Sequence, residues 1–144
     1  MSKPSLFLAL LTAAFTAGAA PASCLTEEED EAGYASCIEK ASDPDSVALC
    51  QKTSLEFWDK QLEQNYDRLK DACSDPGNKN VSSSLCKAKL MSMQRSWQRY
   101  RDEVETVIIA LHDADPAKIQ TMKFIRQATK EQAKHLGSLL MEAK

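Results

Sequence analysis

The chain has 144 residues, of which 43% are hydrophobic and 27% charged, and its net charge is −3. This length suffices for one domain and is short for two, while only four glycines and five prolines argue against a disordered or linker-rich chain. An acidic chain without a basic run is a poor candidate for binding nucleic acid or anionic lipid. Its abundance of Ala, Leu, Lys, Glu and Gln favours helices.

Residues 1–22 have the pattern of a secretory signal peptide. Lys3 precedes an apolar run over residues 6–20, and small residues occupy the −1 and −3 positions of a cut after Ala22. This run is shorter than the about 20 residues of a membrane span. A cut after Ala19 is an alternative, and so is lipid attachment at Cys24, although Pro21 suits a lipobox poorly. We expect residues 23–144 to form a single periplasmic or secreted domain. Removing residues 1–22 takes away one cation and no acid, so the net charge becomes −4.

The spacing of the five cysteines predicts two disulfides. No CxxC pair is present, which argues against zinc and thioredoxin-like chemistry. Helix-breaking stretches at residues 42–45 and 74–80 lie midway between Cys37 and Cys50 and between Cys73 and Cys86. Residues equidistant from the turn of an antiparallel helix pair face each other, so we predict Cys37–Cys50 and Cys73–Cys86. Cys24 is left to be lipidated, free or intermolecular.

Four helices are expected, over residues of about 27–41, 46–74, 84–112 and 116–141. The predicted starts are a capping box from Thr26 to Glu29, a cap at Asp45 or Ser46, the serines at 82–84, and a cap at Asp115 followed by Pro116. Apolar residues recur every three or four positions in the second and third helices. With Cys73 opposite Cys86, these two stripes match in register, so we predict an elongated antiparallel hairpin. The weaker stripe of the last helix predicts that it packs along this hairpin.

The segment from Cys37 to about Glu105 resembles the LprI-like lysozyme-inhibitor family of exported bacterial proteins. The two motifs that carry the resemblance are Asp59, Leu62 and Tyr66, then Gln94, Trp97, Tyr100, Arg101 and Asp102. Glu63 stands where the family usually has Asn, and Glu105 where it usually has Cys. The helix at about 116–141 lies outside the resemblance. We interpret the motif residues as structural, with an Asp59–Arg101 ion pair across the hairpin.

The resemblance implies an inhibitor that binds a lysozyme-like hydrolase and is not an enzyme. No cofactor, metal or integral membrane span is expected, since the two histidines are isolated in sequence and no later segment is apolar enough. An immunity protein against a delivered toxin and a structural or adaptor protein of the envelope are the alternatives, the adaptor docking through the last helix. The candidate contacts for a basic partner are the turn residues Asp75, Gly77, Asn78, Lys79 and Asn80, and the acidic residues Glu27, Glu28 and Glu29.

Overall fold

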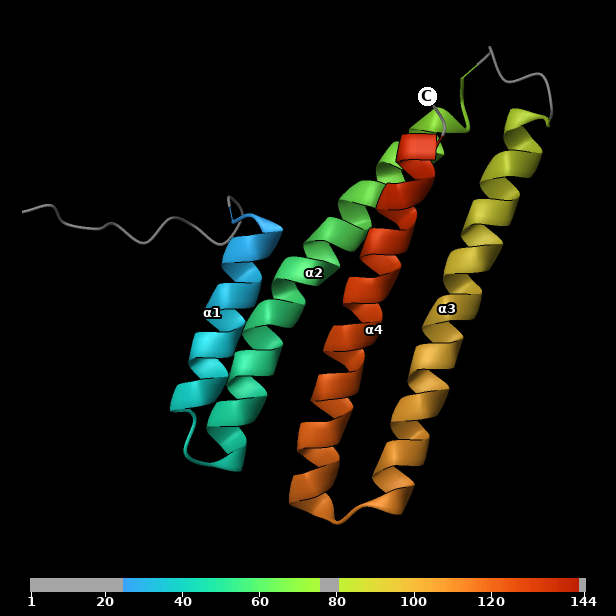
Figure 1. The fold of residues 1–144 in the computed structure, drawn as a ribbon. Coiled ribbons are helices and arrows are strands. Elements are labelled where there is room, and N and C mark those ends of the chain that lie inside the picture. The colour runs from blue at the N-terminus through green and yellow to red at the C-terminus, as the bar shows by residue number, and fades with distance from the viewer. Residues whose placement is uncertain (1–24, 76–80, 143–144) are drawn as a thin grey trace, which may run out of the picture.

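The computed structural model describes residues 25–75 and 81–142, and within these ranges it contains four helices and no strand (Figure 1). The helices are α1 (Glu27–Lys40), α2 (Pro44–Ala72), α3 (Ser83–Leu111) and α4 (Ala114–Glu142). Successive helices run in opposite directions, so that α2 and α4 are parallel (Figure 1). The prediction of an elongated all-α protein of about four helices is confirmed. Over the described ranges, no helix combines the length and the apolarity that a bilayer crossing requires.

Side-chain caps fix the start of the first two helices. Thr26 and Glu29 form the predicted capping box: the Glu29 N–H donates to Thr26 Oγ1 at 3.2 Å, and the Thr26 N–H donates to Glu29 Oε2 at 2.8 Å. The predicted cap of the second helix at Asp45 or Ser46 is wrong. Asp43 is the cap, since its Oδ1 accepts from the Ser46 N–H at 2.8 Å and α2 already begins at Pro44. A proline at the first helical position has no N–H to leave unpaired.

The starts of the last two helices differ in kind, since α3 has a side-chain cap and α4 begins with a backbone hydrogen bond. Ser82 caps α3, as expected, by accepting from the Leu85 N–H at 3.2 Å. The predicted cap of α4 at Asp115 is wrong, because α4 begins at Ala114 and the Ala117 N–H donates to the Asp113 carbonyl at 2.8 Å. Asp115 therefore lies inside the first turn of α4, where its negative charge still suits the helix dipole.

Both predicted disulfides are present. Cys37–Cys50 joins α1 to α2 with a Cα–Cα distance of 5.7 Å, and Cys73–Cys86 joins the end of α2 to the start of α3 with a Cα–Cα distance of 5.5 Å. Each closes a short loop, for which the chain-entropy model gives about 3 kcal/mol of stabilisation. The two disulfides hold opposite ends of α2.

The hydrophobic core lies between α2 and α4, although α3 separates them in the sequence. Its buried members are Phe57, Trp58, Leu62, Ala133 and Leu136. The two helices pack in parallel, so that residues about 70 positions apart meet: Asn65 Nδ2 donates to the Ala133 carbonyl at 2.9 Å, and Arg126 Nε donates to Ser54 Oγ at 2.8 Å. The α4 stripe that looked weak in the sequence therefore forms half of the core.

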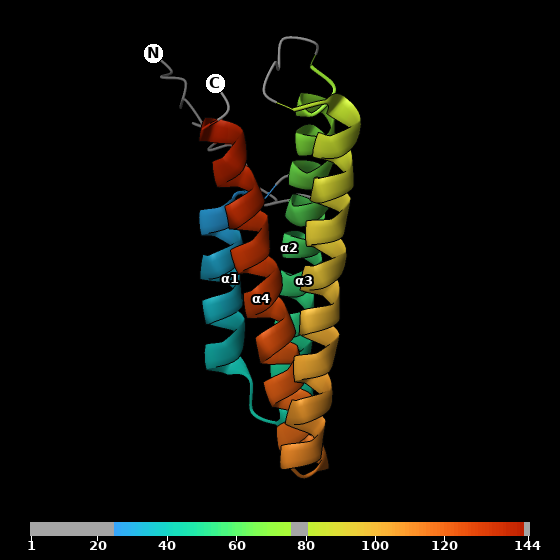
Figure 2. The same cartoon turned by 90° about the vertical axis from the view of Figure 1, so that its right-hand side faces the viewer.

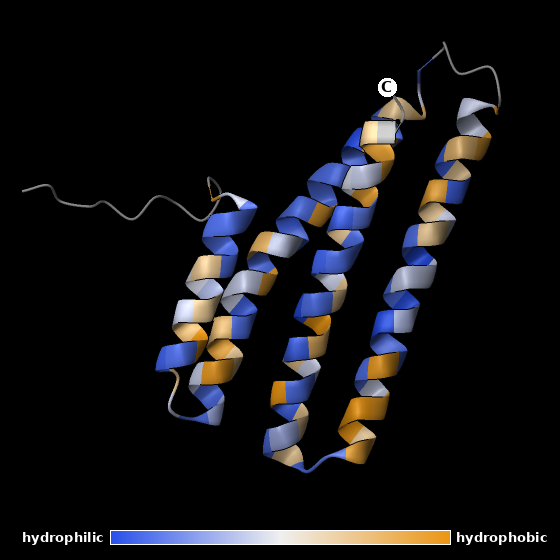
Figure 3. Cartoon of the chain, in the orientation of Figure 1, coloured by the Kyte–Doolittle hydropathy of each residue, from blue (hydrophilic) through white to orange (hydrophobic). Residues whose placement is uncertain are grey.

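The prediction that the apolar stripes of α2 and α3 pack against each other along the whole length of the two helices is wrong. The backbones of α2 and α3 come close at few positions, because α4 occupies the face of α2 that α3 was expected to cover (Figures 1 and 2). Leu90, at 8% exposed, is the one buried residue of α3. The far end of α3 is apolar (Figure 3), and Val107, Ile109 and Leu111 in this stretch are 54%, 56% and 73% exposed.

Candidate functional site

A groove separates α2 from α3 beyond the disulfide that joins their ends. Its volume is about 390 Å³, within the range of roughly 300–1,000 Å³ that is typical of binding sites. The groove is lined by Asp59, Leu62, Glu63 and Tyr66 of α2 and by Met91, Gln94, Arg95 and Gln98 of α3. Half of the residues that carry the family motifs therefore face one open surface, and do not meet in a closed seam between the helices.

Asp59 is the most perturbed acid of this groove. Partial burial raises the pKa of its carboxyl group, with the Arg101 charge acting to lower it and the Glu56 charge to raise it further. The predicted Asp59–Arg101 ion pair does not form at contact distance. Arg101 instead places Nε 3.6 Å from Asp102 Oδ1 and its guanidinium 5.0 Å from the centre of the Trp97 ring. A partly desolvated carboxylate without a close cation of its own is a suitable contact for a cation from a partner.

The motif residues, including those that line the groove, divide between the core and the surface. Leu62 is buried in the core cluster, and Tyr66 and Trp97 pack against that cluster while remaining partly exposed. Gln94 accepts from Gln132 of α4 at 3.4 Å. Tyr100 is 56% exposed. Leu62 is thus a core residue, whereas Tyr100 keeps most of its surface exposed beside its contact with Phe124 of α4.

The acidic start of α1 is tied into the fold and does not form a free charged surface. Glu27 forms an ion pair with Lys134 of α4, and Glu29 belongs to the capping box. The Thr26 N–H holds the pKa of the Glu29 carboxyl below its usual value. Glu28 lies exposed between them. Of the three glutamates proposed from the sequence as partner contacts, two already have partners within the chain.

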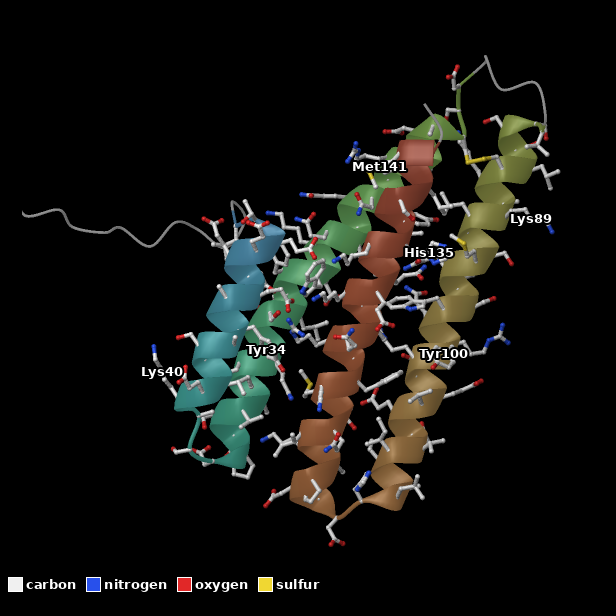
Figure 4. The ribbon with its side chains drawn as sticks, viewed as in Figure 1. Tyr34, Lys40, Lys89, Tyr100, His135 and Met141 are labelled. Carbon is white, nitrogen blue, oxygen red and sulfur yellow. A yellow bond between two sulfur atoms is a disulfide. The ribbon has the colours of Figure 1, made fainter. Side chains whose placement is uncertain are left out.

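A buried charged network joins α1, α2 and α4, and sequence reasoning missed it. Arg126 of α4 is only 5% exposed. Its Nε donates to Ser54 Oγ at 2.8 Å, and the Ser54 hydroxyl in turn donates to Asp30 Oδ2 at 2.7 Å. The guanidinium also lies 3.6 Å from the centre of the Tyr34 ring, which points from α1 toward the other helices (Figure 4). One cation thus holds three helices together.

Two acids of α1 share the charge of this network. Arg126 forms an ion pair with Glu31, and Lys130 Nζ lies 3.1 Å from Glu31 Oε2. Burial raises the pKa of Asp30, because the hydrogen bond from Ser54 and the charge of Arg126 only partly compensate for lost hydration. Burial acts in the same direction on Glu31, but its pKa is lowered overall by Lys130 and Arg126. The sequence signal for this network was a cation inside the apolar stripe of α4, facing an acidic run elsewhere in the chain.

The turn between α2 and α3 carries the other predicted contacts. Gly77, Asn78, Lys79 and Asn80 lie outside the described residues, as do Cys24 and residues 1–22, for which a signal peptide was predicted. Asp75 is described and exposed, and its N–H donates to the Ala72 carbonyl at 3.1 Å. The Cys73–Cys86 disulfide joins the two ends of the segment that contains this turn. Over residues 25–75 and 81–142, no three His, Cys, Asp or Glu side chains are grouped so that they could hold a metal ion.

Comparison with protein families identifies the family of the chain. A family model described as "Lysozyme inhibitor LprI" matches residues 37–136. The chain belongs to the LprI family. The match begins at the first disulfide cysteine and ends at the core residue Leu136, so it includes most of α4 and extends beyond the segment that showed the resemblance in the sequence. No curated protein and no solved structure gives a significant match.

Proposed function

We propose that this LprI-family protein is exported and inhibits a lysozyme-like cell-wall hydrolase by binding to it. The observation that carries the proposal is the family match over residues 37–136, because the family is named for lysozyme inhibition. An inhibitor needs a rigid binding surface and no catalytic groups of its own. Rigidity matters because a surface that is already ordered loses little conformational entropy on binding.

Several features of the chain suit this role. The two disulfides favour persistence in an oxidising compartment outside the cytoplasm, and the apolar N-terminal segment matches an export signal. The net charge of −4 after removal of residues 1–22 would attract a basic enzyme over long range. Such attraction raises the association rate and is weakened by salt.

We propose the turn around Lys79 as the segment that enters the substrate groove of the hydrolase. The Cys73–Cys86 disulfide limits how far the base of this turn can open, and a lysine could pair with the carboxylates that glycosidases use for catalysis. The acidic start of α1 is the second candidate. It is favoured less, since Glu27 and Glu29 already have partners within the chain. Of its three candidate glutamates, this leaves the exposed Glu28 as the contact for a partner.

The test is lysis of cell walls by lysozymes of several types, followed by turbidity, with the purified mature protein added at low and at physiological salt. We expect inhibition that weakens as salt increases. Lys79→Ala should reduce inhibition at least tenfold, while Lys89→Ala, an exposed lysine on the adjoining helix, should change it less than twofold. If Glu28→Gln abolishes inhibition and Lys79→Ala does not, the acidic start of α1 is the contact and the turn is not.

An adaptor role is the second candidate, and one observation favours it. The apolar residues at the end of α3 are exposed, as they would be in a helix that awaits a partner. The apolar stripe of α4, which the sequence suggested as the docking face, cannot serve because Ala133 and Leu136 are buried against α2. Replacement of Val107 and Leu111 by Ser should abolish an adaptor complex and leave lysozyme inhibition unchanged.

A further inference from the structure

A second groove, between α3 and α4, has a different chemical character from the one between α2 and α3. Its volume is about 430 Å³. Three aromatic rings line it, from Trp97 and Tyr100 of α3 and Phe124 of α4. The rings of Tyr100 and Phe124 lie edge to face, with centroids 6.2 Å apart and an angle of 70° between their planes. Side chains of α3 and α4, including Tyr100, extend into the space between these helices (Figure 4).

The groove exists because large residues on α3 face a small residue on α4. Tyr100 meets Phe124, and Gln94 is hydrogen-bonded to Gln132. On α3, Trp97 lies midway between Gln94 and Tyr100. On α4, Ala128 lies midway between Phe124 and Gln132, so it is the residue that Trp97 faces, and both line the groove. An alanine covers little of an indole ring, so Trp97 stays partly exposed although Arg101 lies over its ring, and Tyr100, at 56% exposed, offers most of the open aromatic surface.

Polar side chains border these rings. Gln127 Nε2 donates to Glu131 Oε1 at 2.8 Å, and His135 lies on the next turn of α4 (Figure 4). A side-chain amide offers both donors and an acceptor, and a carboxylate adds further acceptors. Aromatic faces bordered by such groups match a sugar, because a pyranose ring presents an apolar C–H face and a rim of hydroxyl groups that both donate and accept hydrogen bonds.

We propose that the α3–α4 groove binds an oligosaccharide of N-acetylated hexosamines. The acetamido group carries one donor, one acceptor and a methyl group, which suit the glutamine amides and the aromatic rings of this groove. No lysine or arginine lines the groove, whereas Glu131 does, so an anionic ligand is disfavoured. The Arg101 guanidinium already lies over Trp97, which disfavours a quaternary ammonium on that ring. This inference goes beyond inhibition of a hydrolase and does not depend on it.

The test is titration of the mature protein with chito-oligosaccharides of three to six units, in the absence of any lysozyme, followed by tryptophan fluorescence. The chain has two tryptophans, of which Trp58 is 2% exposed and Trp97 lines the groove. A saturable change in emission is expected, and Trp97→Phe should remove most of this change. Affinity should fall at least tenfold in Tyr100→Ala and in Gln127→Ala, both of which alter exposed side chains.

A matched control is Gln98→Ala, which removes an exposed glutamine that lines the α2–α3 groove, and it should change the affinity less than twofold. Absence of saturable binding at millimolar oligosaccharide, with the helical circular dichroism intact, would overturn the proposal. Unchanged affinity in Tyr100→Ala would overturn the location. Equal affinity for cello-oligosaccharides, which lack the acetamido group, would overturn the assignment to N-acetylated sugars. Tighter binding of choline than of any sugar would show that the rings form a cation site and would overturn the proposal. Because the hydrolase is absent, none of these outcomes bears on the proposed inhibition.

Discussion

Substitution of Arg126 by Met tests whether the buried charged network stabilises the fold. Methionine retains much of the side-chain volume but removes the charge and the hydrogen bond to Ser54. Asp30, whose side chain is 6% exposed, then loses the nearby cation, whereas Glu31 keeps Lys130 at 3.1 Å. Removing one partner of a buried pair costs about 3–5 kcal/mol. We expect a loss of about 3 kcal/mol of unfolding free energy at pH 7, at the lower end of that range because one acid keeps a partner.

The assay is urea denaturation followed by circular dichroism at 222 nm, with the disulfides intact. Lys123→Met is the matched control, because Lys123 is exposed on the same helix, and its effect should stay within about 0.5 kcal/mol. Adding Asp30→Asn to Arg126→Met should recover part of the lost stability, since it removes the carboxylate that lacks a cation. Equal stability of Arg126→Met and Lys123→Met would refute the role of the network.

The variant should also respond to pH in a defined direction. The pKa of Asp30 is raised in the folded protein, and loss of Arg126 raises it further because that cation lowers it. A folded-state pKa above the unfolded one means that the native state binds more protons, so this group contributes more stability as pH falls from the folded pKa toward about 3.9. Relative to the wild type, Arg126→Met should therefore be most destabilised at pH 7 and less destabilised at about pH 4.

Three further predictions concern the core, one helix and the disulfides. Leu136→Ala should lower the unfolding free energy by about 2–5 kcal/mol, since Leu136 is 0% exposed, whereas Leu111→Ala at 73% exposed should cost less than about 1 kcal/mol; equal effects in urea denaturation would refute the α2–α4 core. Gly33→Ala in α1 should raise the stability by about 0.5–1 kcal/mol, because a Cβ atom there meets nothing within 4 Å; a lower thermal midpoint would contradict this. Replacing Cys73 and Cys86 together by Ser should cost about 3 kcal/mol and leave far-UV circular dichroism unchanged, and loss of helicity would show that the disulfide forms the fold and does not merely stabilise it.

Local signals in the sequence predicted the helices and both disulfides. Caps such as Thr26 and Ser82 act over three or four residues, and each cysteine pair is joined by a single turn, so these features depend little on the rest of the chain. The caps of α2 and α4 were misplaced by two residues because several aspartates near each start could serve. At the start of α2, the geometry of Pro44 decides in favour of Asp43.

The packing of α2 against α4 could not be predicted in the same way. We expected α3 to pack on the apolar face of α2, because the two helices are adjacent in sequence. Either α3 or α4 could cover that face, and α4 does so, with small residues such as Ala133 packed against α2. The α4 stripe looked weak because Arg126 and Thr129 occupy buried positions within it. A buried arginine becomes favourable only when the acids of α1 are brought beside it, which is a property of the assembled fold.

The candidate grooves are a consequence of this packing. Since α4 covers α2, α3 is left with an open groove on each side, and motif residues such as Tyr66 and Tyr100 line surfaces that the sequence predicted to be closed. The exposure of Tyr100 could not be predicted from the sequence. An apolar stripe with a period of three to four residues does not indicate which of its members another helix will cover.

Binding and inhibition of a lysozyme-like hydrolase by this protein are measured most directly by hydrolysis of a soluble oligosaccharide substrate. Activity is recorded at fixed enzyme concentration while the mature protein is added, with substrate in large excess over the protein so that binding of sugar to the α3–α4 groove cannot deplete it. We predict a decline of activity to a plateau at a fixed molar ratio of protein to enzyme, with a weaker effect at higher salt. Full activity of every lysozyme type at a large molar excess of folded protein would contradict the claim.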